Sequence, residues 1–243
     1  MYLILTMAGK YTRFSQFSGE VPKYLLPISS RTILHYVIKP FYESGQFTKI
    51  FLIANNRDNR FRYQIYDTIA EFGINPEQVL FIEDTPGQTN TAMVGIQCLK
   101  DEKKLPIIIH NIDTILCGRD FKKMRLEFEE KETDCIIDVF NSCNREYSYV
   151  LMKDNSVISI LEKRVISDIA SSGCYGFSNF QLASEYIARS LLEEKGYISS
   201  AIDKMIQDGK KVSISEIKTE SETIVLGTPE EYLASMTFLR EQA

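Results

Sequence analysis

Short, continuous apolar runs alternate with helical stripes through the first half of the chain. Residues 3–7, 49–54 and 105–110 form runs of this kind, each about as long as a strand buried on both faces. Between the first two, residues 32–44 carry apolar side chains at helical spacing. Strands that alternate with helices pair in parallel through crossovers. The pattern predicts an α/β fold with a Rossmann-like, mixed but mainly parallel sheet and helices on both faces.

The second half of the chain follows a different pattern. Residues 147–152 and 157–161 are typical of a β-hairpin, because Asp154 and Asn155 between them are favourable turn residues. This change predicts a small antiparallel region built onto the same sheet. We therefore expect residues 1–243 to form a single domain, with one half at 1–130 and the other at 131–243.

Composition restricts the class of protein and of ligand. With 44% hydrophobic and 25% charged residues, the chain has the balance of an ordinary globule. Its net charge of −5 argues against nucleic acid as a partner, so an anionic ligand needs a local group of cations. No apolar run reaches the roughly 18 residues of a membrane span, and no charged region precedes the first run. We expect a cytoplasmic protein that does not enter a membrane.

The cysteines and histidines do not form a recognisable metal motif. The five cysteines are odd in number and lack C-x-x-C spacing, and the chain has two histidines. We expect buried, reduced thiols, and neither a disulfide framework nor a cysteine or histidine metal cluster.

A cation-bearing loop follows the first apolar run. Ala8-Gly9 allows a sharp turn and a close approach to backbone N–H groups. Three cations follow: Lys10, Arg13 and, between two prolines, Lys23. Cations and free amides at the carboxyl end of a first strand suit a polyphosphate. The alternative for Ala8-Gly9 alone is an ordinary strand-to-helix turn. A Walker P-loop is excluded, since its upstream glycine and spacer are missing.

Two further loops leave predicted strands. Gly87 and Gln88 precede a helix, and Gln88 can both donate to and accept from a pyrimidine edge. The alternative is a Pro-Gly turn with a helix N-cap. Asp113 follows the fourth strand, where a carboxylate could hold Mg²⁺ against phosphate oxygens. The alternative for Asp113 is a helix cap for the segment around Asp120.

Together these segments resemble the signature of the sugar-nucleotidyltransferase (nucleotide-sugar pyrophosphorylase) family. Its first motif reads roughly A-G-x-G-[ST]-R-[FL], and P-K-x-L-x-P-[IV] follows after a gap. Gly9, Thr12, Arg13 and Lys23 match these motifs, whereas Tyr11 stands where the family usually has a second glycine. Within this family, the chain resembles the short bacterial cytidylyltransferases most.

Motifs in the second half continue the resemblance. Glu162-Lys163 followed by arginine is similar to the family's Glu-Lys-Pro, although alone it would be a solvated charge run. Gly173 and Tyr175 match a G-x-Y-x-F strand, and residues 227–231 match G-T-P-E-[DE]. Where some members hold a second metal aspartate, this chain has Val225. Glu220 and Glu222 are the alternatives for that carboxylate.

The resemblance implies a magnesium-dependent nucleotidyltransferase, with a nucleotide-binding first half and an acceptor-binding second half. The implied catalytic residues are Arg13, Lys23 and Lys163. The implied nucleotide-binding residues are Met7, Ala8, Gly9, Lys10, Thr12, Gly87 and Gln88. The implied acceptor-binding residues are Glu162, Gly173 and Tyr175, and Asp113 is the implied metal ligand.

The implied reaction joins a nucleoside triphosphate to a small phosphorylated acceptor, such as a sugar 1-phosphate, and releases pyrophosphate. The short chain favours CTP, and the expected role is in surface polysaccharide biosynthesis. Two alternatives remain. One is a glycosyltransferase of similar fold, although the D-x-D motif of such enzymes is not present at Asp113. The other is a non-catalytic nucleotide-binding relative. The oligomeric state stays open, and apolar surface on the second half would permit a homodimer.

Overall fold

A computed structural model of the chain describes residues 1–100, 105–130, 132–191 and 196–240. The strands are β1 (Tyr2–Thr6), β2 (Pro27–Ile28), β3 (Arg31–Thr32), β4 (Lys49–Asn55), β5 (Val79–Ile82), β6 (Ile107–Asn111), β7 (Thr114–Leu116), β8 (Cys135–Asn141), β9 (Ser148–Lys153), β10 (Ser156–Glu162), β11 (Ile169–Phe177), β12 (Val212–Ile214) and β13 (Thr223–Val225). The helices are α1 (Ser15–Ser18), α2 (Ile33–Glu43), α3 (Arg62–Ala70), α4 (Gln88–Gln97), α5 (Phe121–Glu129), α6 (Phe180–Ser190), α7 (Ile198–Gln207) and α8 (Pro229–Arg240).

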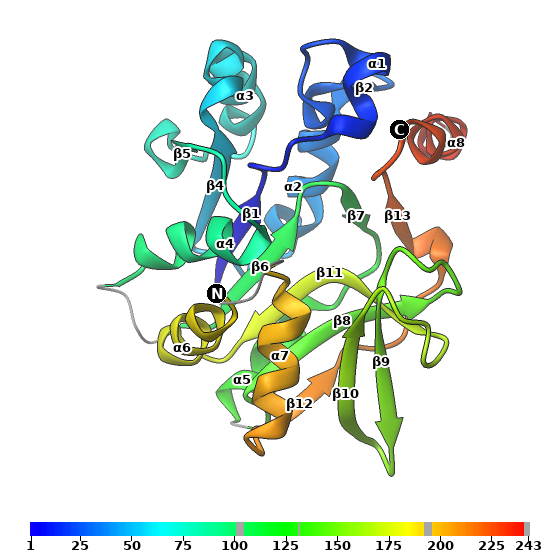
Figure 1. Cartoon of the computed structure of the whole chain (residues 1–243). Helices are drawn as coiled ribbons and strands as arrows, with labels where there is room; N and C mark the ends of the chain where they lie inside the picture. The colour runs from blue at the N-terminus through cyan, green and yellow to red at the C-terminus, as the bar shows by residue number, and fades with distance from the viewer. Residues whose placement is uncertain (101–104, 131, 192–195, 241–243) are drawn as a thin grey trace.

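One large sheet, nine-stranded within the described residues, runs through the molecule (Figure 1). Its first part has the order β6-β1-β4-β5, and all of these neighbours pair in parallel. Next to β6 lies β11, which is antiparallel to β6, β8 and β9. The hairpin β9–β10 completes that edge, and β12 adds to β8 in parallel. The predicted α/β fold with a mainly parallel part and an antiparallel extension is confirmed.

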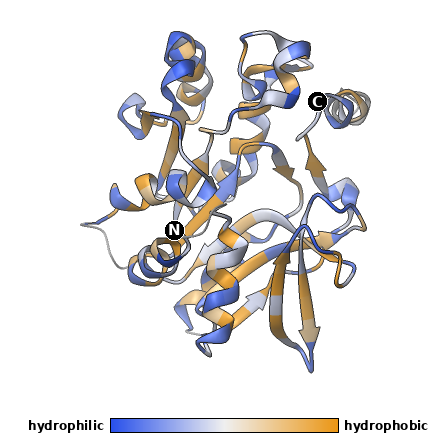
Figure 2. Ribbon diagram, in the orientation of Figure 1, coloured by the Kyte–Doolittle hydropathy of each residue, from blue (hydrophilic) through white to orange (hydrophobic). Residues whose placement is uncertain are grey.

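Alternating residues of β1 face two separate cores. Leu3 and Leu5 pack with residues of α2, α3, α5 and α8, whereas Tyr2 and Ile4 pack with residues of α4, α6 and α7. Helices therefore cover both faces of the sheet, as the continuous apolar run of β1 predicted. Figure 2 shows the same layering: the central strands are mostly hydrophobic, and hydrophilic residues gather on helices and loops outside them.

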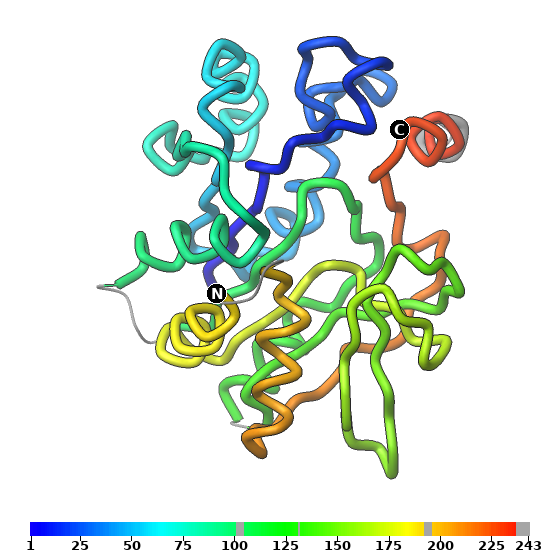
Figure 3. Tube along the Cα trace, in the orientation of Figure 1, coloured from blue at the N-terminus to red at the C-terminus, as the bar shows by residue number. Residues whose placement is uncertain are grey.

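The C-terminal helix α8 lies beside the loop that follows β1. In Figure 3 the red segment of α8 lies close to the blue segment around α1. The Tyr232 hydroxyl donates to the Pro27 carbonyl at 2.6 Å, and its ring packs edge-on against Phe14 and Phe17. The C-terminal helix thus supports the cation-bearing loop of the N-terminal segment.

Several local expectations can be compared with the structure. The predicted turn at Asp154-Asn155 joins β9 to β10, with both residues at positive φ. The expected helix at 32–44 does not end at Pro40 but continues to Glu43. The expectation that the thiols are buried is wrong for Cys98 and Cys143, which are exposed, although all five cysteines are free. Both residues lie at element ends or in loops, where a thiol need not enter the core.

The division into halves at residue 130 does not interrupt the sheet, because β6 before it pairs with β11 after it. Residues 101–104, 131, 192–195 and 241–243 of those expected halves lie outside the described residues. No helix among the described residues combines the length and apolar character needed to cross a membrane.

Candidate functional site

A cleft lies where the parallel strands β1, β4, β5 and β6 end. The carboxyl ends of parallel strands share one edge, and open α/β sheets bind ligands there. The cleft has two chambers, with cavity volumes of about 640 Å³ and 240 Å³. We call them the first and the second chamber. Gln88, Asn111 and Asp113 line both, so the chambers are joined.

The predicted site residues are distributed over the two chambers. Lining the first chamber are Met7, Ala8, Gly9, Lys10, Lys23, Gly87, Gln88 and Asp113. Lining the second are Arg13, Glu162, Lys163, Gly173 and Tyr175, together with Gln88 and Asp113. Thr12 is exposed in a short 3₁₀ helix and lines neither of them. Arg13, expected beside the triphosphate, thus lies in the second chamber instead of next to Lys23.

Lys23 and Asp113 form an ion pair at the junction of the chambers. Lys23 Nζ lies 2.6 Å from Asp113 Oδ2, and the two side chains are 14% and 26% exposed. Burial raises the pKa of Asp113, but the charge and hydrogen bond of Lys23, together with His110 and a backbone N–H, outweigh burial, so the pKa lies below its ordinary value. The carboxylate is therefore charged at neutral pH. The helix near Asp113 is capped by a different residue, Asp120, whose Oδ1 accepts from the Lys123 N–H at 2.8 Å.

The turn that carries Asp113 is held from two sides. Its backbone carbonyl accepts from the Leu226 N–H at 2.7 Å, next to the β7–β13 ribbon. On the other side, His110 Nε2 is 2.8 Å from the Thr114 carbonyl oxygen. Burial lowers the pKa of His110, which favours the neutral ring. A neutral His110 can donate from Nε2 to that carbonyl and fix the start of β7.

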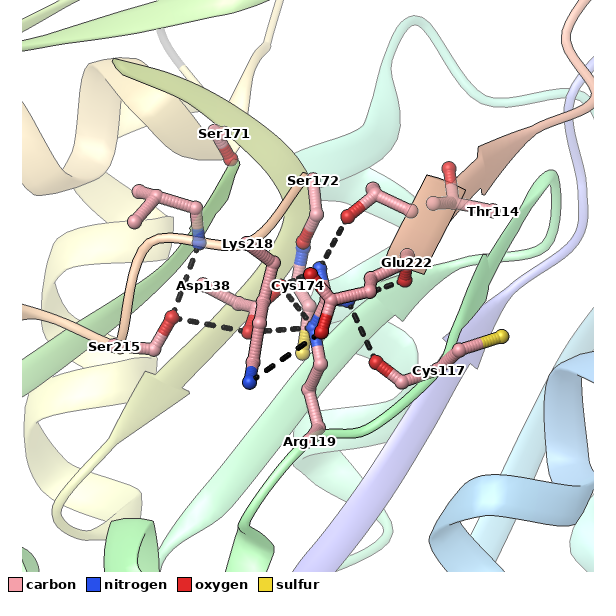
Figure 4. A network of polar contacts seen from close by, with 12 residues as sticks. Thr114, Cys117, Arg119, Asp138, Ser171, Ser172, Cys174, Ser215, Lys218 and Glu222 are labelled. Carbon is pink, nitrogen blue, oxygen red and sulfur yellow. Dashed lines mark hydrogen bonds and ion pairs between the residues drawn. The ribbon is translucent and has the colours of Figure 1, made fainter. Parts of the chain in front are cut away.

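A buried ion pair supports the same ribbon from beneath (Figure 4). Arg119 and Asp138 are 3% and 1% exposed, and their closest atoms are 3.0 Å apart. Arg119 also donates to the carbonyls of Cys117 and Glu222 and to the Thr223 hydroxyl. These acceptors lie at the ends of β7 and β13, so the guanidinium ties the two strands together. The sequence did not indicate this pair, since its members lie on different elements.

Tyr11 occupies the position where the family usually has glycine. Its backbone is left-handed, with φ 31° and ψ 38°, a conformation that glycine adopts readily and tyrosine at some cost. The Tyr11 hydroxyl donates to Asp58 at 2.6 Å, and the Tyr24 hydroxyl donates to the other oxygen at 2.9 Å. Asp58 is fully buried. The loop thus keeps a glycine-like path, and a side-chain hydrogen bond holds it there.

Arg57 holds the loops of the site without lining either chamber, and the sequence interpretation missed it. It donates to the carbonyls of Ala8 and Gly9 at 3.1 and 3.3 Å and to Asp84 at 2.8 Å. These contacts turn the carbonyls of the loop toward a cation and link the loops after β1, β4 and β5. Its position in the sequence could have indicated this role, because Arg57 lies two residues after the end of β4, at the edge where the parallel strands end.

Gly87 and Gly173 are required by close contacts. A Cβ on Gly87 would lie 2.8 Å from the Gly196 carbonyl oxygen, and the Thr89 N–H donates to that oxygen at 3.1 Å. Gly173 has φ +80°, and its Cβ would lie 2.2 Å from Asn111 Nδ2. Neither position tolerates a side chain without rearrangement. Gln88, the first residue of α4, donates to the Thr6 hydroxyl at 3.3 Å.

The second chamber combines hydroxyls with carboxylates. Glu162 Oε2 accepts from the Ser148 hydroxyl and, at 2.9 Å, from the Ser199 hydroxyl. Its other oxygen, together with Ser171 and Ser172 of β11, supplies the kind of groups that bind a hydroxyl-rich ligand.

A three-way ion pair crosses the second chamber. Glu146 Oε2 lies 3.0 Å from Arg13 Nη2 and 3.2 Å from Lys163 Nζ. Hydrogen bonds from Lys163 and Arg13 hold the pKa of Glu146 below its ordinary value. Lys163 itself has a positive φ of 54°. The sequence interpretation places Arg13 among the cations for a polyphosphate and Lys163 in the acceptor-binding half, and it does not include Glu146.

The second carboxylate near Asp113 is Glu231. Glu220 and Glu222 line neither chamber; they accept from Ser142 and Thr219 instead. Glu231 lines the second chamber with Asp113. A Cβ on Gly227 would lie 3.3 Å from Glu231 Oε2 and 3.8 Å from Asp113 Oδ2, so glycine keeps the space between them open.

Glu231 also helps to cap the start of α8. Its carboxylate accepts from the Thr228 N–H at 2.9 Å, and its own N–H donates to the Thr228 hydroxyl at 3.2 Å. Burial, with the charge of Asp113, raises the pKa of Glu231. Two neighbouring carboxylates in a cleft are a donor set that suits Mg²⁺, which prefers one or two carboxylates plus phosphate oxygens.

The chain matches a known protein family. Residues 2–241 match the sequence model of a family described as nucleotidyl transferase. A curated relative, the bifunctional protein GlmU of Methanococcus vannielii, is 24% identical over 226 residues, which cover 88% of this chain and 50% of the relative. The chain thus spans about half the length of that relative.

Solved structures share the fold. One is a nucleoside-diphosphate-sugar pyrophosphorylase from Vibrio cholerae RC9, with a TM-score of 0.80, 22% identity, and coverage of 97% of this chain and 99% of that one. Another is a UDP-glucose pyrophosphorylase in complex with UDP-glucose, with a TM-score of 0.78, 14% identity and full coverage of both chains. At these identities the likeness establishes the architecture alone.

Proposed function

Because the chain belongs to the nucleotidyl transferase family, we propose that it joins a nucleoside triphosphate to a small phosphorylated acceptor and releases pyrophosphate. The observation that carries this proposal is the pair of joined chambers, with Lys23 and Asp113 at their junction. One chamber offers backbone and cations for a nucleotide. The other offers hydroxyls, carboxylates and cations for a phosphorylated polyol.

In this reaction, a phosphate oxygen of the acceptor attacks the α-phosphorus of the triphosphate. The bond from that phosphorus to the bridging oxygen of the β-phosphate breaks, and pyrophosphate leaves with the electron pair. The nucleophile is already an anion, so no general base is needed. The work of the protein is to align two anions and to neutralise the crowded charge. Lys23 and Lys10 are available to the triphosphate, and Lys163 and Arg13 to the acceptor phosphate.

Asp113, with Glu231 beside it, is the carboxylate that would hold a divalent ion such as Mg²⁺. When bound, the ion would supply positive charge to the phosphates. The Lys23 ammonium has a related task, because it keeps Asp113 ionised and shields it while no other cation is near.

Within this activity, we favour CTP as the nucleotide and a sugar 1-phosphate as the acceptor. Gln88 lines the first chamber and can donate to and accept from a pyrimidine edge. The carboxylate of Glu162 suits the hydroxyls of a sugar. The product would be an activated sugar for glycosyl transfer, which is consistent with a role in surface polysaccharide biosynthesis.

The test is a panel of each nucleoside triphosphate against a set of phosphorylated acceptors, with Mg²⁺ present and pyrophosphate release as the readout. Release with CTP and a sugar 1-phosphate supports the full proposal. Release with UTP or dTTP keeps the reaction and replaces the base assignment. Triphosphate binding without release across the whole panel would instead identify a non-catalytic relative. Transfer from a ready-made nucleotide sugar, without pyrophosphate, would identify a glycosyltransferase.

A further inference from the structure

The carboxylate of Glu146 lies where two phosphate-binding cations converge. Arg13 comes from the loop after β1 and Lys163 from the end of β10, and both contact the same oxygen of Glu146. Because one oxygen reaches both nitrogens, a single phosphate group can also reach both. We infer that Arg13 and Lys163 form one shared phosphate subsite, and that Glu146 occupies it until a phosphate displaces it.

The surrounding backbone fixes this arrangement. The Lys163 N–H donates to the Tyr147 carbonyl at 3.0 Å, next to Glu146 in sequence. The Glu146 N–H donates to Asn144 Oδ1 at 3.1 Å. Lys163 is held at positive φ, a strained conformation for a residue with a side chain. Local strain of this kind is concentrated at ligand sites.

The contacts of Glu146 are weak enough to be replaced. The side chains of Arg13, Glu146 and Lys163 are 54%, 53% and 42% exposed, and ion pairs this exposed contribute little to stability. A phosphate dianion carries more charge than a carboxylate and offers more acceptor oxygens, so it can satisfy both cations at once. Without an anion between them, the two cations would repel each other across the chamber.

This inference rests on the proposed function and deepens it, since it assigns the acceptor's phosphate to both cations. It also adds a consequence for turnover: the carboxylate of Glu146 competes with the acceptor phosphate and helps to expel it. The subsite connects the two halves of the chain, because Arg13 and Glu146 are 133 residues apart.

The first experiment measures the binding of inorganic phosphate by calorimetry at low ionic strength. We expect Glu146→Gln to tighten the dissociation constant by about three- to tenfold, as removal of one exposed competing charge would do. The matched control is Glu129→Gln, which changes the same charge in another half-exposed pair with an arginine, Arg125. The control should leave phosphate affinity unchanged. Unchanged or weaker binding by Glu146→Gln would overturn the inference.

The second experiment tests whether one phosphate uses both cations. In the Glu146→Gln background, Arg13→Gln and Lys163→Gln should each abolish the gained phosphate affinity. Loss through only one of them would show that the cations serve different groups, and the shared subsite would be wrong.

The same preparations are assayed for pyrophosphate release, so that the two proposals can fail separately. Turnover in a protein whose phosphate affinity does not respond to Glu146→Gln would reject the subsite and keep the proposed function. Tighter phosphate binding in Glu146→Gln, without turnover anywhere in the panel, would reject the proposed function and support the subsite.

Discussion

At the scale of single residues, the site depends on charges whose partners are now identified. Lys23 Nζ and Asp113 Oδ2 are 2.6 Å apart, so the two charges neutralise each other while a substrate is absent. Lys23 lines the first chamber, and Asp113 lines both chambers. In this arrangement, removal of either one leaves its partner without compensation at the point where negative charge would accumulate.

We expect Lys23→Ala and Asp113→Ala each to reduce kcat by about 100-fold or more, comparable to the loss of one charge-stabilising donor. The measurement is pyrophosphate release under saturating substrates. Lys39→Ala, which removes an exposed lysine paired with Glu43 on α2, is the matched control and should stay near wild type. Near-normal turnover in a Lys23 or Asp113 variant would contradict its role.

Tyr11 gives a second prediction, because its hydroxyl is one of two donors to the buried Asp58. Tyr11→Phe should lower the free energy of unfolding by about 1–3 kcal/mol, the cost of leaving a buried acceptor short of a partner. It should also raise the KM for the triphosphate more than it lowers kcat, since the loop is loosened. Urea unfolding and steady-state kinetics check both effects. Tyr63→Phe, at an exposed tyrosine, is the control; equal stability of the two variants would disprove the role of the hydrogen bond.

The buried His110 predicts how stability depends on pH. Burial lowers its pKa in the folded chain, so below the ordinary value of about 6.5 the unfolded chain binds a proton that the folded chain does not. The free energy of unfolding should therefore fall as the pH is lowered from 6.5 to 5.5, by up to about 1.4 kcal/mol per pH unit for this group. His110→Gln should reduce that slope in urea unfolding. An unchanged slope would assign the effect to His35, whose pKa burial also lowers.

At the scale of elements, the site depends on two loops and one ribbon that the sheet brings to the same edge. The ribbon β7–β13 holds Asp113 and Gly227 at the same end, because Thr114, which follows Asp113, pairs with Val225, two residues before Gly227. Its anchor is the Arg119–Asp138 pair (Figure 4). A buried pair of this kind contributes mainly through the penalty that its disruption would bring.

Arg119→Met should lower the free energy of unfolding by about 3–5 kcal/mol, because Asp138 is left buried without a counter-charge. The double variant Arg119→Met with Asp138→Leu should recover much of this loss. Thermal and urea unfolding provide the measurement. Arg125→Met removes an exposed pair with Glu129 on α5 and should change stability by less than about 1 kcal/mol. A mild effect of Arg119→Met would show that the ribbon is held by its backbone contacts alone.

At the scale of the whole molecule, the two halves of the chain share one sheet. The pairing of β6 with β11 crosses residue 130, and both cores combine residues from before and after that point. The two halves therefore share one sheet and both cores, and residues from both halves line the cleft.

We expect unfolding to occur in a single cooperative transition. Far-UV circular dichroism and tyrosine fluorescence, the natural probe in a chain without tryptophan, should give coincident urea curves. A fragment ending at residue 130 should not fold, because β6 would expose an unpaired edge to solvent. Two separated transitions, or a folded fragment, would show that the halves are independent domains.

The sequence alone determined the layers of this protein and most of its candidate site. Continuous apolar runs and helical stripes report the burial of each segment by itself, so they predicted the parallel strands, the hairpin and the edge at which Lys23 and Asp113 lie. Only the tertiary structure decided which side chains meet across that edge. Glu146 reaches Arg13 over 133 residues, and Tyr11 reaches Asp58 over 47. Such contacts depend on how the sheet positions distant loops, and local periodicity contains no information about that.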